Sequence, residues 1–169
     1  EIKRLGVEPI GIEINSNRVN IISDLVYFLK LRKVIFSIAP DIVISYTMKP
    51  IVYSGLALFN NKKIKYFPMI TGTGHIFNEN SLLIKIIRLF LIIGLKFSLL
   101  KATKIIFQNK DNFNLLEKYR IVRKNNSVVV NGSGVDTNHY HKSPLPDSEL
   151  TFILIARLLI DKGIREYVE

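Results

Sequence analysis

The chain has 169 residues, 48% of them apolar, which suits a folded core and excludes a largely disordered segment. It contains no cysteine, which excludes disulfide bonds and thiolate zinc sites. Its net charge of +10 predicts an anionic partner, such as a phosphorylated substrate, an anionic lipid surface or a nucleic acid.

Short apolar runs typical of strands alternate with longer runs typical of helices. Asn20 is expected to cap the first helix, Ala39-Pro40 to end it, and Pro50 to lie in the first turn of the second. The expected strands lie at residues 7–14, 41–46, 65–71, 104–108 and 127–130, and the expected helices at 21–38, 51–59, 81–100 and 110–119. This alternation predicts an α/β fold with a Rossmann-like, doubly wound parallel sheet that has helices on both faces.

A long polar stretch follows residue 130 and predicts a change of domain. It begins with Asn131-Gly-Ser-Gly134 and contains Pro144 and Pro146, a composition typical of interdomain linkers. Beyond it, Leu150 to Ala156 is typical of a buried strand, and Gly163 begins a helical pattern. We therefore expect a domain over 1–130, a linker over 131–149 and the start of a second domain over 150–169. Both ends interrupt a pattern, which indicates a truncated chain.

Two expected loops at the carboxyl ends of strands carry candidate site residues, because ligands of open parallel sheets bind there. Lys49 precedes a helix N-terminus, which suits an anion; a solvated lysine beside an ordinary helix is the alternative. In Thr71-Gly72-Thr73-Gly74-His75, the glycines allow a ligand close to the backbone, and His75 can exchange a proton near neutral pH. A tight turn with a structural histidine fits the same residues.

A third loop, which follows residues 150–156, carries Arg157 and Lys162 in front of the last helix. Two such cations can clamp a diphosphate against a helix N-terminus, whereas a salt bridge with Asp161 would give them a purely structural role. No metal or cofactor is expected at any of these loops.

Several segments resemble one enzyme family. Asn131-Gly-Ser-Gly-Val-Asp136 and Phe152-Ile-Leu-Ile-Ala-Arg-Leu-Leu-Ile-Asp-Lys-Gly-Ile-Arg-Glu-Tyr167 are similar to the linker and the opening C-terminal-domain strand of family 4 glycosyltransferases. Pro40-Asp-Ile-Val-Ile-Ser-Tyr-Thr-Met-Lys-Pro50, Ile70-Thr-Gly-Thr-Gly74 and Phe107-Gln-Asn109 resemble the subgroup that adds sugars to lipid-linked carriers in bacterial polysaccharide assembly, such as capsule or O-antigen. The resemblance covers nearly the whole chain.

The resemblance implies the GT-B fold, in which two Rossmann-like domains face a cleft. It implies that Arg157 and Lys162 grip the diphosphate of a nucleotide-sugar donor and that transfer is retaining. Because these two charges would stabilise the leaving diphosphate, no metal is expected to be required. The acceptor is expected beside Lys49, Gly72, Thr73 and Gly74, with His75 near the reacting centre. The family's glycine-rich first loop would precede Glu1 and its acidic donor motif would follow Glu169, so the chain alone is expected to be inactive.

The apolar segment Leu82 to Leu100 bears on membrane contact. Its cations, Lys85, Arg88 and Lys96, fall on one narrow side of a helix, and three cations are unfavourable for a transmembrane span. A basic amphipathic helix on an anionic membrane fits this pattern, and so does a core helix with one wet stripe. With a lipid-linked acceptor, we expect a cytoplasmic protein that is peripheral on the inner face of the plasma membrane.

The expected partners are therefore a nucleotide-sugar donor, a lipid-linked or saccharide acceptor and an anionic membrane. Nucleic acid is not expected, because the basic residues are dispersed and no RNP-like string of aromatic residues occurs. Two other functions stay open. One is a sugar-nucleotide epimerase with the same architecture, and the other is a non-catalytic, membrane-binding remnant of such an enzyme.

Overall fold

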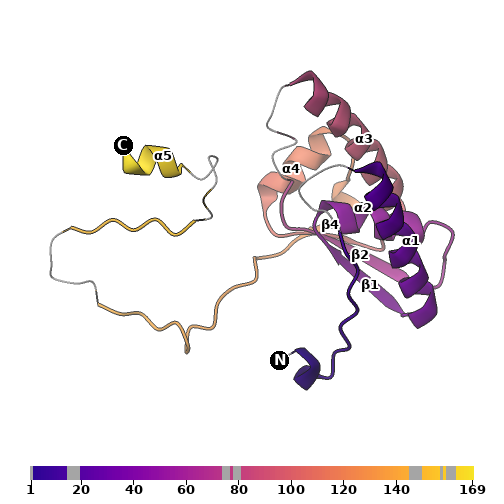
Figure 1. Cartoon of the computed structure of the whole chain (residues 1–169), viewed down its shortest axis with the longest axis horizontal. Coiled ribbons are helices and arrows are strands. Elements are labelled where there is room, and N and C mark those ends of the chain that lie inside the picture. Colours follow the sequence, from indigo (N-terminus) through magenta and orange to yellow (C-terminus); the bar gives the residue numbers. More distant parts are fainter. Residues whose placement is uncertain are drawn as a thin grey trace. The chain divides into compact units, whose positions relative to one another are not determined.

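Four parallel strands form one sheet in the order β1-β2-β3-β4 (Figure 1). The strands are β1 (Ile42–Tyr46), β2 (Lys65–Ile70), β3 (Ile105–Phe107) and β4 (Ser127–Val129). In this computed structural model the described residues are 2–14, 20–73, 77, 81–144, 150–156, 158 and 163–169. The four strands lie where the apolar runs predict them, so the prediction of an α/β fold with a parallel sheet is confirmed.

The four longer helices also lie close to their expected positions. They are α1 (Ile21–Ile38), α2 (Met48–Ala57), α3 (Leu82–Leu99) and α4 (Lys110–Lys118). The side chain of Asn20 accepts hydrogen bonds from the backbone N–H groups of Ile22 and Ser23, which confirms the predicted cap. Pro50 lies in the first turn of α2, as predicted, and the helix begins at Met48. A proline in a first turn lacks only an N–H that has no intrahelical partner there.

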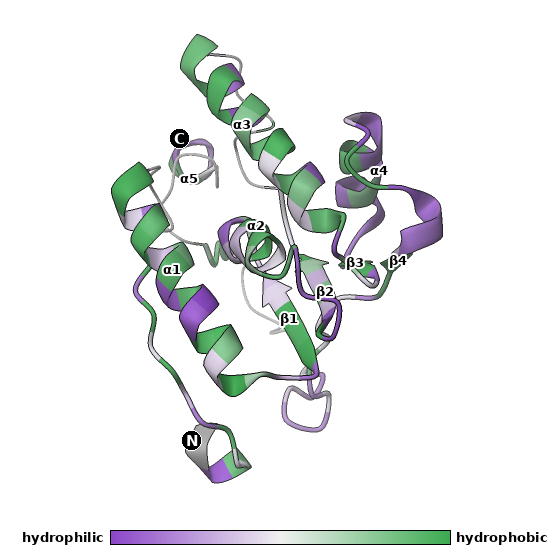
Figure 2. Ribbon diagram, turned by 90° about the vertical axis from the view of Figure 1, so that its right-hand side faces the viewer, coloured by the Kyte–Doolittle hydropathy of each residue, from purple (hydrophilic) through white to green (hydrophobic). Residues whose placement is uncertain are grey.

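The described helices that contact the sheet all cover the same face (Figure 2). This covered face includes Tyr66, Ile70, Ile105 and Phe107, which are buried. A right-handed crossover that always steps to the next strand in one direction places every helix on the same side. The predicted second layer of helices is therefore absent from the described part of the chain. The opposite face instead exposes apolar side chains, namely Ile42, Ile44, Tyr46 and Val128.

The contact between α2 and α3 is the closest helix packing in this layer. The side-chain hydroxyls of Tyr66 and Ser98 both donate to the carbonyl oxygen of Ile51, at 2.7 and 2.8 Å. Gly55 faces Ser98 so closely that an added Cβ would lie 2.5 Å from the Ser98 carbonyl oxygen. The close approach of α3 thus requires a glycine at residue 55. Burial of Tyr66 against this layer raises the pKa of its phenol to about 12.

Two predicted strands, at residues 7–14 and 150–156, are wrong. Both stretches are described and neither is a strand; residues 7–14 follow a short 3₁₀ helix, η1 (Ile2–Leu5). Pro9 lacks a donor for a ladder and Gly11 weakens an extended run, and neither stretch has a strand partner among the described residues. Apolar composition alone does not make a strand, because a strand is held by its neighbours.

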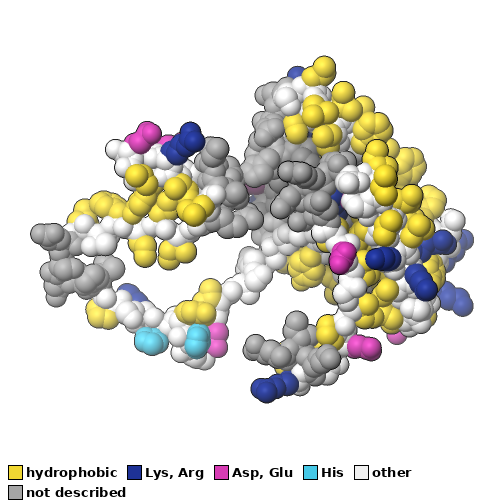
Figure 3. Space-filling model, in the orientation of Figure 1, with side chains coloured by type: hydrophobic (Ala, Val, Ile, Leu, Met, Phe, Trp, Pro, Cys, Tyr) yellow, Lys and Arg dark blue, Asp and Glu magenta, His cyan; other side chains and the backbone are white. Residues whose placement is uncertain are grey.

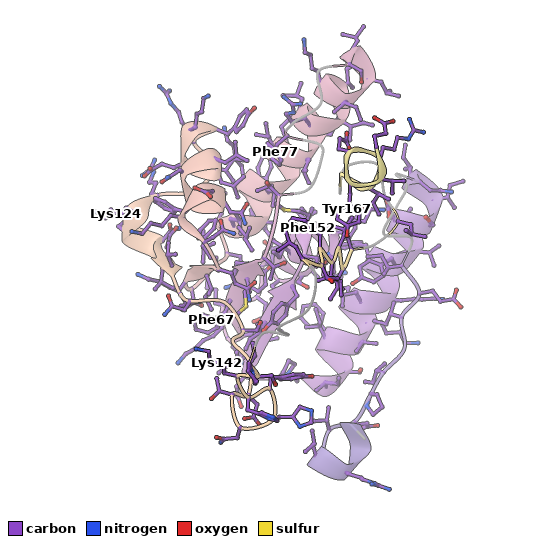
Figure 4. All side chains as sticks on the ribbon, turned by 90° about the vertical axis from the view of Figure 1, so that its left-hand side faces the viewer. Phe67, Phe77, Lys124, Lys142, Phe152 and Tyr167 are labelled. Carbon is purple, nitrogen blue, oxygen red and sulfur yellow. The ribbon has the colours of Figure 1, made fainter. Side chains whose placement is uncertain are left out.

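The chain divides into two compact units, residues 1–133 and 134–169. The first contains the sheet, its helices and the 3₁₀ helix η3 (Lys124–Asn126), and the second contains the short helix α5 (Ile164–Val168). In the second unit, the Tyr167 hydroxyl donates to the Phe152 carbonyl oxygen at 2.7 Å (Figure 4). The assignment of 131–149 to a linker and of 150–169 to a donor-binding domain stays a prediction.

Candidate functional site

Polar segments follow three neighbouring strands of the sheet. Residues 47–49 follow β1, residues 71–73 follow β2, and residues 108–109 follow β3. Because β1, β2 and β3 are adjacent and parallel, these segments lie along one edge of the sheet, which we call the carboxyl edge. The first turns of α2 and α4 begin there, so backbone N–H groups are available beside the polar side chains.

Thr47 joins β1 to α2 with a strained backbone. Its φ of 66° and ψ of 160° lie in a region that β-branched residues rarely adopt. It occupies the N-cap position of α2, but its side chain makes no capping hydrogen bond. Strain of this kind costs on the order of 1–3 kcal/mol and concentrates at functional sites. The β1–α2 junction is thus a candidate part of a ligand site.

Lys49, a predicted acceptor-side residue, forms an ion pair with Asp24 on α1. Its Nζ lies 2.8 Å from Asp24 Oδ1, and the two side chains are only 21% and 10% exposed. Burial, followed by the charge and the hydrogen bond of Asp24, raises the pKa of Tyr53 to about 12. Lys49 therefore ties α1 to α2, a structural role that the sequence did not predict. Its role in binding an acceptor phosphate stays a prediction.

Asp24 is the residue that the sequence interpretation missed. It is the only acidic residue on α1, an otherwise apolar and basic helix, and it lies in the first turn. A single buried carboxylate on such a helix requires a cationic partner. The isolated Asp24 on this helix could therefore have predicted an ion pair, although the sequence alone did not identify Lys49 as its partner.

The loop after β2 is tied to the start of α4. Thr73 Oγ1 lies 3.5 Å from Asn112 Oδ1, and Asn109 Oδ1 caps α4 by accepting from the Asn112 backbone N–H at 2.8 Å. Gly72 is exposed, and an added Cβ there would meet no atom within 4 Å. The loop therefore presents open backbone beside hydroxyl and amide groups. Such neutral donors and acceptors suit the hydroxyl groups of a saccharide.

Four predicted site residues, Gly74, His75, Arg157 and Lys162, lie outside the described residues. Lys49, Gly72 and Thr73 are described, and all three lie on the carboxyl edge. Within the described ranges, no three His, Asp or Glu residues lie together as ligands for a metal ion. No helix in these ranges has the length and the apolar character needed to cross a membrane.

An open cavity of about 650 Å³ lies away from the carboxyl edge, between α1 and the C-terminal end of α2 with the residues that follow it. Phe28, Phe36 and Phe59 line it, together with Arg32, Asn60 and Asn61. The Arg32 guanidinium carbon lies 5.3 Å from the centre of the Phe36 ring, which is a cation–π contact. The sequence did not predict this cavity, and it contains none of the predicted site residues.

No protein-family model matches the sequence, and no curated protein matches it. The fold defines an α/β protein with a four-stranded parallel sheet. Sheets of this kind occur in proteins with many different functions, so the fold alone does not determine the function.

Proposed function

We propose that this protein is a retaining glycosyltransferase that moves a sugar from a nucleotide-diphosphate donor to a lipid-linked or saccharide acceptor in cell-surface polysaccharide assembly. The observation that carries the proposal is the open backbone at Gly72 beside Thr73 and Asn112 on the carboxyl edge. Hydroxyl and amide groups next to an unobstructed backbone are suited to bind an acceptor saccharide. The resemblance of the sequence motifs to family 4 glycosyltransferases supports the proposed binding of a nucleotide-sugar donor.

In this proposal the carboxyl edge binds the acceptor. Residues 72–74 hold the saccharide, and His75 contacts it near the reacting centre. The uncapped first turn of α2, with Lys49 beside it, faces the phosphate of a lipid-linked acceptor, because free N–H groups and a cation both favour an anion.

Arg157 and Lys162 hold the donor diphosphate in this proposal. The bond between the anomeric carbon and the diphosphate breaks, and its electron pair leaves with the diphosphate. A bond forms from that carbon to an acceptor hydroxyl oxygen, and the hydroxyl proton passes to an oxygen of the leaving diphosphate. Two fixed cations stabilise the charge that develops on the leaving diphosphate, so the reaction requires no metal ion. A lipid-linked acceptor places the enzyme in the cytoplasm, on the inner face of the plasma membrane.

Acceptor binding can be tested by NMR titration of the whole ¹⁵N-labelled chain with a short-chain prenyl diphosphate that carries one hexose. We expect the largest amide shifts at Thr47, Gly72, Thr73 and Asn112. Thr73→Val should weaken binding by about 3- to 10-fold, because one neutral hydrogen bond contributes about 1 kcal/mol. Thr137→Val, an exposed threonine outside the sheet unit, is the matched control and should bind normally.

Shifts confined to the cavity beside Phe28 and Phe36, or equal affinity of the Thr73→Val variant, would contradict the proposed acceptor site. Product analysis with a radiolabelled nucleotide sugar separates the enzyme classes. Label in the prenyl-linked product indicates a transferase, whereas a new free nucleotide sugar indicates the epimerase alternative.

A further inference from the structure

Helix α3 exposes an apolar face. Leu82, Leu83 and Phe90 are 76%, 67% and 70% exposed. The other exposed apolar side chains of this face are Ile86, Leu89, Ile93 and Phe97, with Leu100 just past the end of the helix. Lys85 and Lys96 are exposed beside them, whereas Arg88 is half-buried. A core helix would expose a polar stripe to water, whereas the exposed side of α3 is mainly apolar. Soluble proteins rarely expose an apolar surface of this length unless it binds a partner.

Helix α1 repeats this pattern on the same side of the sheet. Ile21 and Ile22 are 81% and 77% exposed, and Leu25, Leu29 and Phe36 continue the apolar surface along the helix. Helix α2 packs between α1 and α3, so both helices belong to one layer. Figure 3 shows apolar side chains gathered over α1 and α3, with Lys and Arg side chains beside them. We call the exposed surface of α1 and α3 the helical face.

The N-terminal turns of both helices lie at the end of this layer that faces the carboxyl edge. Each helix precedes a strand of the parallel sheet and runs opposite to it, so each begins near the carboxyl ends of the strands. The three most exposed apolar side chains of the helical face, those of Ile21, Ile22 and Leu82, are in these first turns, and Leu83 lies beside them. The apolar end of the helical face is therefore the end nearest to residues 47–49 and 71–73.

The charge of the helical face has one sign. Its exposed charged side chains are Lys30, Arg32, Lys33, Lys85 and Lys96. The only carboxylate on α1, α2 and α3 is that of Asp24, which is buried and paired with Lys49. A second copy of this chain would bring like charges together, which disfavours self-association through this face. Cations beside an extended apolar surface match the headgroups and the acyl region of an anionic bilayer.

We propose that the helical face docks this protein on an anionic lipid bilayer, with the first turns of α1 and α3 inserted most deeply and the rest of the face lying against the headgroups. The docking itself rests on the exposed side chains and their charge. Its consequence, that the carboxyl edge is held at the surface where the phosphate of a lipid-linked acceptor lies, rests on the proposed function.

The test is flotation of the whole chain with vesicles that contain no acceptor lipid. We expect binding to phosphatidylcholine vesicles that contain phosphatidylglycerol, much weaker binding to phosphatidylcholine alone, and loss of binding as salt screens the cations. Lys85→Glu/Lys96→Glu should weaken binding by at least about 30-fold, because two cations near an anionic surface contribute about that factor. The matched control is Lys118→Glu/Lys124→Glu, which changes the net charge equally away from the helical face and should bind nearly as the unchanged protein does.

A second pair of variants tests the apolar contribution. Phe90→Ser should weaken vesicle binding by about 10-fold or more, because a phenylalanine side chain loses its burial in the bilayer. Phe152→Ser, a phenylalanine that is 73% exposed in the other unit, is the control and should have little effect. Circular dichroism must show that all variants keep their helices.

Equal losses from test and control pairs, equal binding to neutral and anionic vesicles, or a concentration-dependent dimer that Phe90→Ser abolishes would overturn the docking proposal. These outcomes do not depend on glycosyl transfer, since no acceptor or donor is present. Conversely, if the short-chain prenyl diphosphate that carries one hexose does not bind, the proposed function is contradicted, while the docking on vesicles is unaffected.

Discussion

Removal of the Lys49 charge tests both the packing of α1 on α2 and the proposed role of this lysine. In Lys49→Met the aliphatic stem is retained, but Asp24 loses its cationic partner at 2.8 Å. The Asp24 side chain is only 10% exposed, so water compensates its charge poorly. Exposed ion pairs contribute about 0.2–1 kcal/mol, and breaking fully buried pairs costs about 3–5 kcal/mol. For this partly buried pair, we expect the free energy of unfolding to fall by about 2 kcal/mol.

Asp24→Asn keeps the shape of the side chain and leaves Lys49, which is 21% exposed and therefore better hydrated. We expect a loss of about 1 kcal/mol, which is smaller because water can solvate part of the lysine. The double variant should lose less than the sum of the single variants, because its second substitution removes a charge that has already lost its partner. Urea unfolding at neutral pH, with an unchanged m value, measures all three changes.

If the losses in the free energy of unfolding of the two single variants add up to that of the double variant, the ion pair does not stabilise the fold. An unchanged urea midpoint for Lys49→Met would lead to the same conclusion. The same variants separate structure from binding. If Lys49 holds the acceptor phosphate, Lys49→Met should weaken binding of the prenyl diphosphate, while Asp24→Asn should leave it intact or strengthen it. Equal affinity of both variants would remove Lys49 from the acceptor site without changing its role in stability.

Three further predictions concern stability. Gly55→Ala should lower the free energy of unfolding by about 2 kcal/mol, because its methyl group would meet backbone of α3, whereas Gly94→Ala, which faces a movable valine side chain at 3.2 Å, should change it by less than about 0.5 kcal/mol. Equal urea midpoints for these two variants would contradict this. Thr47→Gly should raise the free energy of unfolding by about 1 kcal/mol, as measured by thermal unfolding, because glycine relieves the positive φ; a decrease would count against strain there. The pKa values of Tyr53 and Tyr66 are raised from 10.0 to about 12, so the unfolded chain loses these protons first; stability should hold below pH 10 and fall between pH 10 and 12, with a smaller fall in Tyr66→Phe.

The local elements could be read from the sequence because their causes are local. The cap at Asn20 needs only the N–H groups two and three residues later, and the apolar runs of β1 to β4 need only short-range composition. The parallel direction of the strands could be predicted because the strands alternate with helices. The same local evidence placed Lys49, Gly72 and Thr73 at the ends of strands, and the structure places them on one edge.

Tertiary structure decided the features that depend on distant partners. Residues 7–14 and 150–156 have the composition of strands but form none, because pairing and not composition holds a strand. Lys49 pairs with Asp24 across 25 positions of the chain, a contact that only the packing of α1 on α2 creates. Periodicity placed the three cations of α3 on one side, but only the packing against α2 determined that most of the exposed side is apolar. A helix face has no environment until its neighbours are in place, which is why the sequence left both interpretations of α3 open.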